Sequence, residues 1–151
     1  MREGDVTPAM RRSAKAVNFG IIYGESAFGL SQSLGISPTE AAEFIRRYFE
    51  AYPAVKEYLN GTVEFAKANG YVTTLFGRKR DIPELRSPNY NVRQFGERAA
   101  MNMPLQGSSA DIIKIAMISV REELKKRNMR SRLILQVHDE LVIDAAEDEA
   151  D

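Results

Sequence analysis

Four side chains that could hold a nucleotide recur at every fourth position near the start of the chain. They are Arg11, Lys15, Phe19 and Tyr23. On an α-helix these positions share one face, each about 6 Å further along the axis. A guanidinium and an ammonium could bind phosphates, and the two rings beyond them could contact a sugar and a base. An amphipathic surface helix with solvated cations has the same spacing, so spacing alone does not decide between the two interpretations.

Two carboxylates that could bind a metal ion lie near the end of the chain. The apolar runs 133–137 and 141–143 are rich in strand-forming residues and flank His138-Asp139-Glu140. This pattern predicts a β-hairpin with the acids at its tip. A carboxylate held there could bind Mg²⁺, which prefers oxygen ligands, although a solvated turn has the same composition. The sequence has one histidine and no cysteine, which excludes a cluster of His or thiolate ligands.

A third polar row lies in the helical pattern of residues 91–128. Arg98, Asn102 and Gln106 again recur at every fourth position. A guanidinium and two amides on one face could contact phosphates and the minor-groove acceptors of base pairs, which are similar for all four pairs. A solvated polar helix face is the alternative that spacing leaves open.

Two of these strings resemble one family. The string Arg11-Arg12-x-x-Lys15-x-x-Asn18-Phe19-Gly20-x-x-Tyr23-Gly24 is similar to the nucleotide-binding fingers helix of family A DNA polymerases, the bacterial DNA polymerase I type. The string Gln136–Glu140 resembles the palm hairpin of the same family, which bears a catalytic aspartate. The resemblance runs from near Thr7 to the C-terminus.

The resemblance implies template-directed phosphoryl transfer, in which a primer 3′-hydroxyl attacks the α-phosphate of a deoxynucleoside triphosphate (dNTP) with two Mg²⁺ ions. It implies primer–template DNA and dNTPs as partners, a part in DNA replication and repair, and a cytoplasmic, nucleoid-associated bacterial protein. The implied catalytic residues are Asp139, which is also the metal ligand, Glu140 as an auxiliary, and Lys15 as proton donor to the leaving pyrophosphate. Arg11, Lys15, Phe19 and Tyr23 would bind the nucleotide, and Arg98, Asn102, Gln106, Gln136 and His138 would contact DNA.

The expected fold class is α+β and mainly helical, with fingers helices and a partial palm that carries the catalytic β-hairpin. Residues 1–86 are expected to form the fingers subdomain, with the nucleotide-binding helix at 8–23, and residues 87–151 the partial palm. The palm would hold the long DNA-facing helix and the His-Asp-Glu hairpin.

Capping residues and turn residues predict the local elements. Thr7-Pro8 and Ser37-Pro38 are typical helix starts, and Gly24 and Gly70 are typical helix ends. Helices are expected over 8–23, 25–35, 38–52 and 54–69, followed by a short hairpin over 71–83 and helical structure over 91–128 with a kink or interruption near Pro104 and Gly107. The stripe Met10, Ala14, Val17 and Ile21 and the aromatic residues of the helices over 38–69 are expected in the core.

The charge is unevenly distributed. Lysine and arginine total 21, as do aspartate and glutamate, but residues 139–151 hold seven acids and no base. The first 138 residues therefore carry 21 bases against 14 acids, a net charge of +7. A basic body is compatible with a polyanionic partner, and the length suits one domain with a sizeable core.

One departure from the family pattern limits the expected activity. Two-metal catalysis needs carboxylates from different segments, and the family's Asp-Tyr-Ser-like motif does not precede Thr7. We therefore expect a fragment that does not polymerise DNA alone, needs the upstream palm and thumb as partners, and self-associates through exposed apolar surface. A non-catalytic nucleic-acid-binding helical module and a helical interaction protein are the alternatives.

Overall fold

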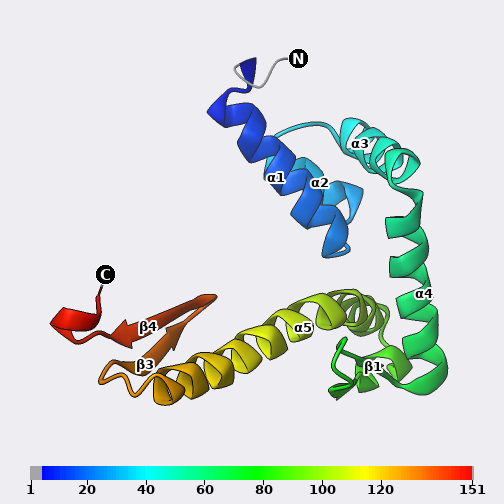
Figure 1. Ribbon diagram of the computed structural model, residues 1–151. Helices are drawn as coiled ribbons and strands as arrows, with labels where there is room; N and C mark the ends of the chain where they lie inside the picture. The colour runs from blue at the N-terminus through cyan, green and yellow to red at the C-terminus, as the bar shows by residue number, and fades with distance from the viewer. Residues whose placement is uncertain (1–4, 151) are drawn as a thin grey trace. The chain divides into compact units, whose positions relative to one another are not determined.

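The computed structural model describes residues 5–150 (Figure 1). The chain forms two compact units, residues 1–105 and 106–151. The first unit contains α1 (Pro8–Ile22), α2 (Ala27–Leu34), α3 (Pro38–Ala51), α4 (Pro53–Asn69), β1 (Tyr71–Thr73), β2 (Lys79–Asp81), the 3-10 helix η2 (Pro83–Arg86) and the start of α5 (Tyr90–Lys126). The second unit contains the rest of α5, β3 (Arg132–Val137), β4 (Glu140–Asp144) and the 3-10 helix η3 (Glu147–Glu149). The predicted α+β, mainly helical class is confirmed.

The helices α1 and α3 begin at the predicted caps, Thr7 and Ser37. Thr7 Oγ1 accepts a 3.2 Å hydrogen bond from the backbone N–H of Met10. Ser37 and Glu40 form a reciprocal capping box at the start of α3. The helices α1 and α2 lie side by side (Figure 1), and Gly24, with a φ of +70°, turns the chain between them. The predicted boundaries are therefore confirmed within one or two residues for α1 and α3.

The core of the first unit lies where α4, the β1–β2 hairpin, η2 and α5 meet. Its buried cluster consists of Ala66, Val72, Ile82, Ala100 and Met103. The predicted short hairpin is confirmed, with Val72 opposite Arg80 in an antiparallel register. A Cβ on Gly96 of α5 would lie 3.0 Å from the backbone nitrogen of Leu85, so the missing side chain lets α5 approach η2 closely.

Two predictions about the core are wrong. The aromatic side chains of α3 and α4 were expected inside, yet Phe44, Tyr58 and Phe65 are 47%, 45% and 45% exposed. Of the apolar stripe on α1, only Ile21 is buried, and Met10 is 42% exposed. The periodicity is correct, but α1 and α3 pack on few neighbours in this unit, so an apolar face is only partly covered.

Of the kink or interruption predicted near Pro104, an interruption is not found, because α5 continues through this residue to Lys126. A proline removes one backbone donor, here to the carbonyl of Ala100, but it leaves the flanking helical hydrogen bonds in place. Both Ala100 and Met103 are buried, so packing holds this turn in the helix. The division between the two units falls directly after it, between Leu105 and Gln106.

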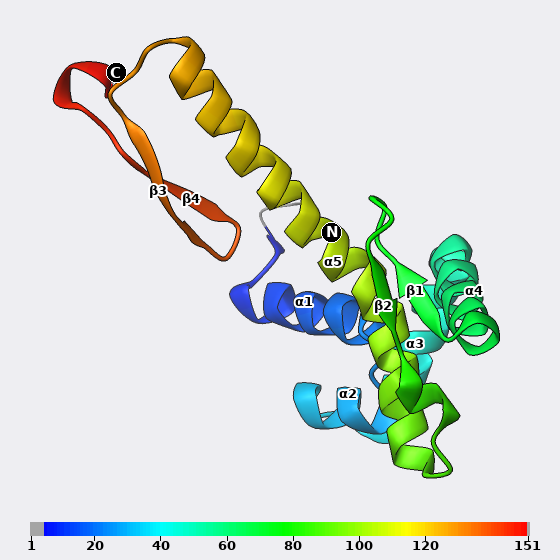
Figure 2. The same ribbon diagram turned by 90° about the horizontal axis from the view of Figure 1, so that it is seen from below.

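The second unit presents the predicted hairpin of β3 and β4 (Figure 2). Val137 pairs with Glu140, so the connection is the two-residue turn His138-Asp139. A register irregularity follows Leu133. Several apolar side chains of the hairpin are exposed, as expected: Ile134, Leu135, Val137, Val142 and Ile143. Over residues 5–150, no helix is long and apolar enough to cross a membrane.

Candidate functional site

The cation–aromatic row predicted on α1 is present on its exposed face. Lys15 Nζ lies 5.8 Å from the ring centroid of Phe19. The rings of Phe19 and Tyr23 follow each other with centroids 5.8 Å apart and an interplanar angle of 44°. Phe19 is 48% exposed, and the side chains of Arg11 and Lys15 are exposed as well. This face can therefore offer two cations and two accessible rings to a ligand.

A hollow of about 430 Å³ adjoins the aromatic end of this row. Phe19 and Tyr23 line it from α1, Ser33 from α2 and Arg98 from α5, and Glu25 lines it from the turn between α1 and α2. The turn at Gly24 contacts α5 directly, since a Cβ there would lie 3.2 Å from Cγ of Arg98. The structure thus brings the first residue of the predicted DNA-contacting row to the end of the predicted nucleotide-binding row.

Glu25 and Ser33 are polar residues of this hollow that the sequence did not point to. The carboxylate of Glu25 accepts a 3.0 Å hydrogen bond from the hydroxyl of Ser33. The signal available in the sequence was an acidic residue directly after the Tyr23-Gly24 helix end. It could not be interpreted from the sequence, because its contacts depend on how α2 returns along α1.

The remaining DNA-contacting candidates on α5 have different surroundings. Asn102 is half-buried, and its Oδ1 has no hydrogen-bond partner among residues 5–150. This oxygen is itself buried, and a buried amide oxygen left unpaired carries an energetic cost. Gln106 is exposed and is the first residue of the second unit.

The hairpin turn holds the acidic candidates at its tip. His138 adopts a φ of +53°, a left-handed conformation at the first turn position that suits the twist of a two-residue hairpin. Its carbonyl accepts a 2.6 Å hydrogen bond from Nε2 of Gln136, and the side chains of Asp139 and Glu140 are exposed. Exposed carboxylates on a hairpin suit Mg²⁺, which commonly takes only one or two protein ligands. Within the described part of the chain, no three His, Cys, Asp or Glu side chains lie close enough to hold a metal ion together.

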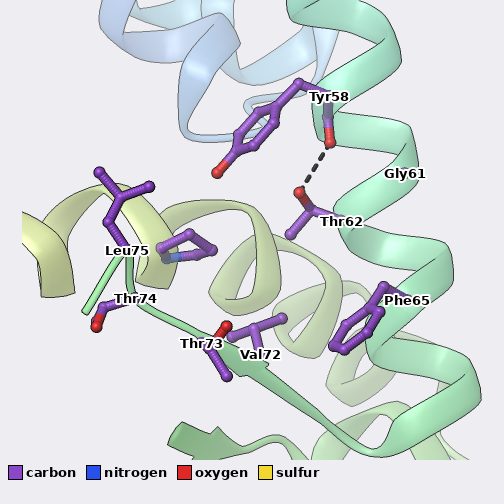
Figure 3. Close-up of a pocket in the computed structure, with 9 residues that line it drawn as sticks. Tyr58, Gly61, Thr62, Phe65, Val72, Thr73, Thr74 and Leu75 are labelled. Carbon is purple, nitrogen blue, oxygen red and sulfur yellow. Dashed lines mark hydrogen bonds between the residues drawn. The ribbon is translucent and has the colours of Figure 1, made fainter. Parts of the chain in front are cut away.

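Two other hollows of the first unit contain none of the predicted site residues. One of about 440 Å³ lies between α4 and β1 (Figure 3), where the hydroxyl of Thr62 donates a 2.8 Å hydrogen bond to the carbonyl of Tyr58. The other, of about 640 Å³, lies along the apolar face of α1, between Met10 and Phe44. Their linings are mostly apolar, which suits packing more than phosphate binding.

Known proteins resemble the whole of this chain. The family described as DNA polymerase family A matches residues 1–151. DNA polymerase I of Caldicellulosiruptor bescii is 60% identical over 147 residues, which are 97% of this chain and 17% of the relative. DNA polymerase I of Bacillus subtilis is 58% identical over 145 residues, 96% of this chain and 16% of the relative. The chain thus spans about a sixth of the length of these curated relatives.

A solved structure is similar over nearly the full chain. It is described as the POL domain of Pol1 from M. smegmatis in complex with DNA primer-template and dNTP. It shares 49% sequence identity and a TM-score of 0.91, and the match covers 95% of this chain and 25% of that one. The match of the family to every residue, and of the relatives to nearly all of them, places this chain in DNA polymerase family A.

Proposed function

We propose that this chain is the nucleotide-binding and DNA-contacting part of a template-directed DNA polymerase that acts in bacterial replication and repair. The observation that carries the proposal is the hollow at the end of the Phe19–Tyr23 row, which Arg98 of α5 also lines. A nucleotide held on α1 would there meet the start of the α5 row. The solved relative binds both primer-template DNA and dNTP, which supports the same pair of partners here.

The row on α1 would bind the incoming dNTP by charge and by ring contact. Arg11 and Lys15 are exposed cations that would neutralise the triphosphate, with Arg11 able to contact two phosphate oxygens at once. Lys15 would also donate a proton to the departing pyrophosphate. Phe19 would pack on the sugar, and Tyr23 would lie near the templating base.

The α5 row and the hairpin would contact the primer–template duplex. Arg98, Asn102 and Gln106 would lie along the minor groove, whose acceptors are similar for all base pairs. Gln136 and His138 would lie near the primer terminus. Residues 1–86 would then serve as the fingers and residues 87–151 as part of the palm, in a cytoplasmic enzyme that works on the nucleoid.

Asp139 would be the metal ligand, with Glu140 as an auxiliary. Two Mg²⁺ ions bound there would stabilise the attacking and leaving oxygens of the phosphoryl transfer. The chain's own part is to hold Asp139 in a two-residue turn that strand pairing fixes. Because a further carboxylate from another segment is needed, the 151-residue chain by itself would not extend a primer.

Primer extension tests the proposal. The 151-residue chain is compared with a longer polymerase in which the same residues follow the palm and thumb segment of a family A relative, both with Mg²⁺ and dNTPs. We expect extension only by the longer chain, and none after Asp139→Ala. Extension by the short chain would mean that its own residues supply the second carboxylate. Failure of both chains, with retained DNA binding, would favour a non-catalytic nucleic-acid-binding module.

A further inference from the structure

Glu25 links the last turn of α1 to the last turn of α2. Its backbone N–H donates a 2.8 Å hydrogen bond to the carbonyl of Gly20. Its side chain returns over α2, where Oε1 accepts the 3.0 Å hydrogen bond from the hydroxyl of Ser33. One residue is therefore bonded to both helices.

Two glycines make room for this side chain. A Cβ on Gly20 would lie 2.4 Å from Oε2 of Glu25, and a Cβ on Gly29 would lie 2.8 Å from its Cγ and 2.9 Å from its Oε1. All three separations are shorter than van der Waals contact allows. The Glu25 side chain thus fills a slot between the bare Cα atoms of α1 and α2, so its length and the spacing of the two helices are matched.

The same carboxylate forms part of the wall of the hollow beside Phe19 and Tyr23. Tyr23 and Gly24, the two residues before Glu25, end α1, and Gly24 lies against Met101 and Arg98 of α5. A change in the Glu25 side chain would therefore alter the wall of the hollow beside Ser33 of α2. It would also shift the end of α1. Arg11 and Lys15, at the far end of α1, would be little affected.

We propose that Glu25 is a positioning residue that sets the separation of α1 from α2 and thereby the place of Phe19 and Tyr23 against the nucleotide. This inference rests on the proposed function of α1. It predicts that loss of the side chain weakens the use of dNTP more than the chemical step, because the phosphate-binding and metal-binding groups stay in place. It also predicts that the length of the side chain and its acceptor oxygen matter, and that its charge does not.

The test uses the longer polymerase that carries these residues and measures KM for dNTP and kcat separately in single-nucleotide insertion. For Glu25→Ala we expect a rise in KM of roughly 5–10-fold, the effect of about one lost hydrogen bond, with kcat changed less than KM. Glu25→Gln keeps the length and an oxygen that accepts from Ser33, so it should restore KM to near the unsubstituted value. Gly29→Ala displaces the carboxylate from the other side and should raise KM as Glu25→Ala does.

Gly35→Ala separates positioning from a general loosening of α2. Gly35 ends the same helix with a φ of +67°, and no atom lies within 4 Å of a Cβ built there. This variant should lower stability and leave KM unchanged. Equal rises in KM for Gly35→Ala and Glu25→Ala would overturn the inference, and so would a failure of Glu25→Gln to restore KM.

The same experiment tells this inference apart from the proposed function. If the unsubstituted longer polymerase does not extend a primer, the proposed function is wrong and the nucleotide role of Glu25 is wrong with it. If it extends the primer and Glu25→Ala has an unchanged KM, only the role of Glu25 is overturned.

Discussion

Gly24 and Arg98 are in direct contact in the first unit. The Cα of Gly24 lies so close to α5 that an added Cβ would be 3.2 Å from Cγ of Arg98 and 3.0 Å from Sδ of Met101. The two residues belong to different sequence motifs, one at the end of the α1 row and one at the start of the α5 row. Their contact holds the two rows at one hollow, which is the basis of the proposed function.

The first prediction concerns this contact. Gly24→Ala places a side chain at a φ of +70°, where strain costs about 1–2 kcal/mol, and also pushes it into α5. Gly35→Ala is the matched control, with a φ of +67° and open space around the new Cβ. We expect Gly24→Ala to lower the free energy of unfolding by about 1–3 kcal/mol more than Gly35→Ala, as overpacking does. Urea denaturation of both variants measures the difference in the free energy of unfolding. An equal loss of stability in the two variants would show that Arg98 and Met101 of α5 move aside without cost.

A second prediction tests the phosphate-binding role of Lys15. Lys15→Ala should weaken dNTP binding about tenfold or more, because a charge-assisted hydrogen bond to phosphate is lost. Lys56→Ala is a close control, since Lys56 Nζ lies 5.9 Å from the ring of Phe49, much as Lys15 Nζ lies 5.8 Å from the ring of Phe19. Both variants lose a similar cation–ring contact, but only Lys15→Ala should raise KM for dNTP in primer extension. The same rise in both would indicate a general charge effect.

A third prediction separates Asp139 from other acids of the hairpin. Loss of a residue that only supports a metal ligand typically lowers activity roughly 10–100-fold. Asp139→Asn changes the proposed ligand itself, so in the longer polymerase it should reduce kcat by more than this. Asp144→Asn removes a similarly exposed carboxylate at the other end of β4, opposite Arg132, and should leave kcat nearly unchanged. Rates are compared over a range of Mg²⁺ concentrations. If Asp144→Asn lowered kcat as much as Asp139→Asn, the total negative charge of the hairpin would matter, and Asp139 would not be a specific metal ligand.

A fourth prediction concerns the pH dependence of the base of this hairpin. Hydrogen bonds from the Ser131 hydroxyl and from the backbone N–H groups of Arg130 and Ser131 lower the pKa of Glu149 below its usual 4.5. An acid with a lowered pKa in the folded state stabilises that state fully above its unfolded pKa and loses this effect as the pH falls through the folded value. The attachment of η3 to β3 should therefore weaken progressively below about pH 4.5.

Backbone NMR shifts of Arg130 and Ser131, followed from pH 6 to pH 2 (roughly the range in which carboxylates titrate), measure this attachment. Glu149→Gln should abolish the titration of these shifts and loosen η3 at all pH values, because an amide offers one acceptor oxygen in place of two. Glu147→Gln, in the same short helix, should leave both unchanged. Identical titration curves for the unsubstituted chain and Glu149→Gln would show that another acid is responsible.

Much of the secondary structure follows from local sequence alone. Ser37 and Glu40 form their capping box within a single turn, and Gly70 ends α4 by its own left-handed conformation. The His138-Asp139 turn and the strands beside it were likewise predictable from neighbouring residues. These features depend on hydrogen bonds between residues a few positions apart, which the order of residue types reveals directly.

Tertiary packing decided what the side chains of these elements meet. Periodicity places Phe44 and Tyr58 on apolar helix faces, but it does not state whether another element covers them, and both are substantially exposed. Pro104 remains inside α5, in a turn whose neighbours Ala100 and Met103 are buried. The sequence by itself determined the helices, the hairpins and the four-residue spacing of the candidate site. Only the tertiary structure joined Glu25, Ser33 and Arg98 to the row on α1, because contacts between distant segments depend on how close the backbones can come at Gly20, Gly24 and Gly29.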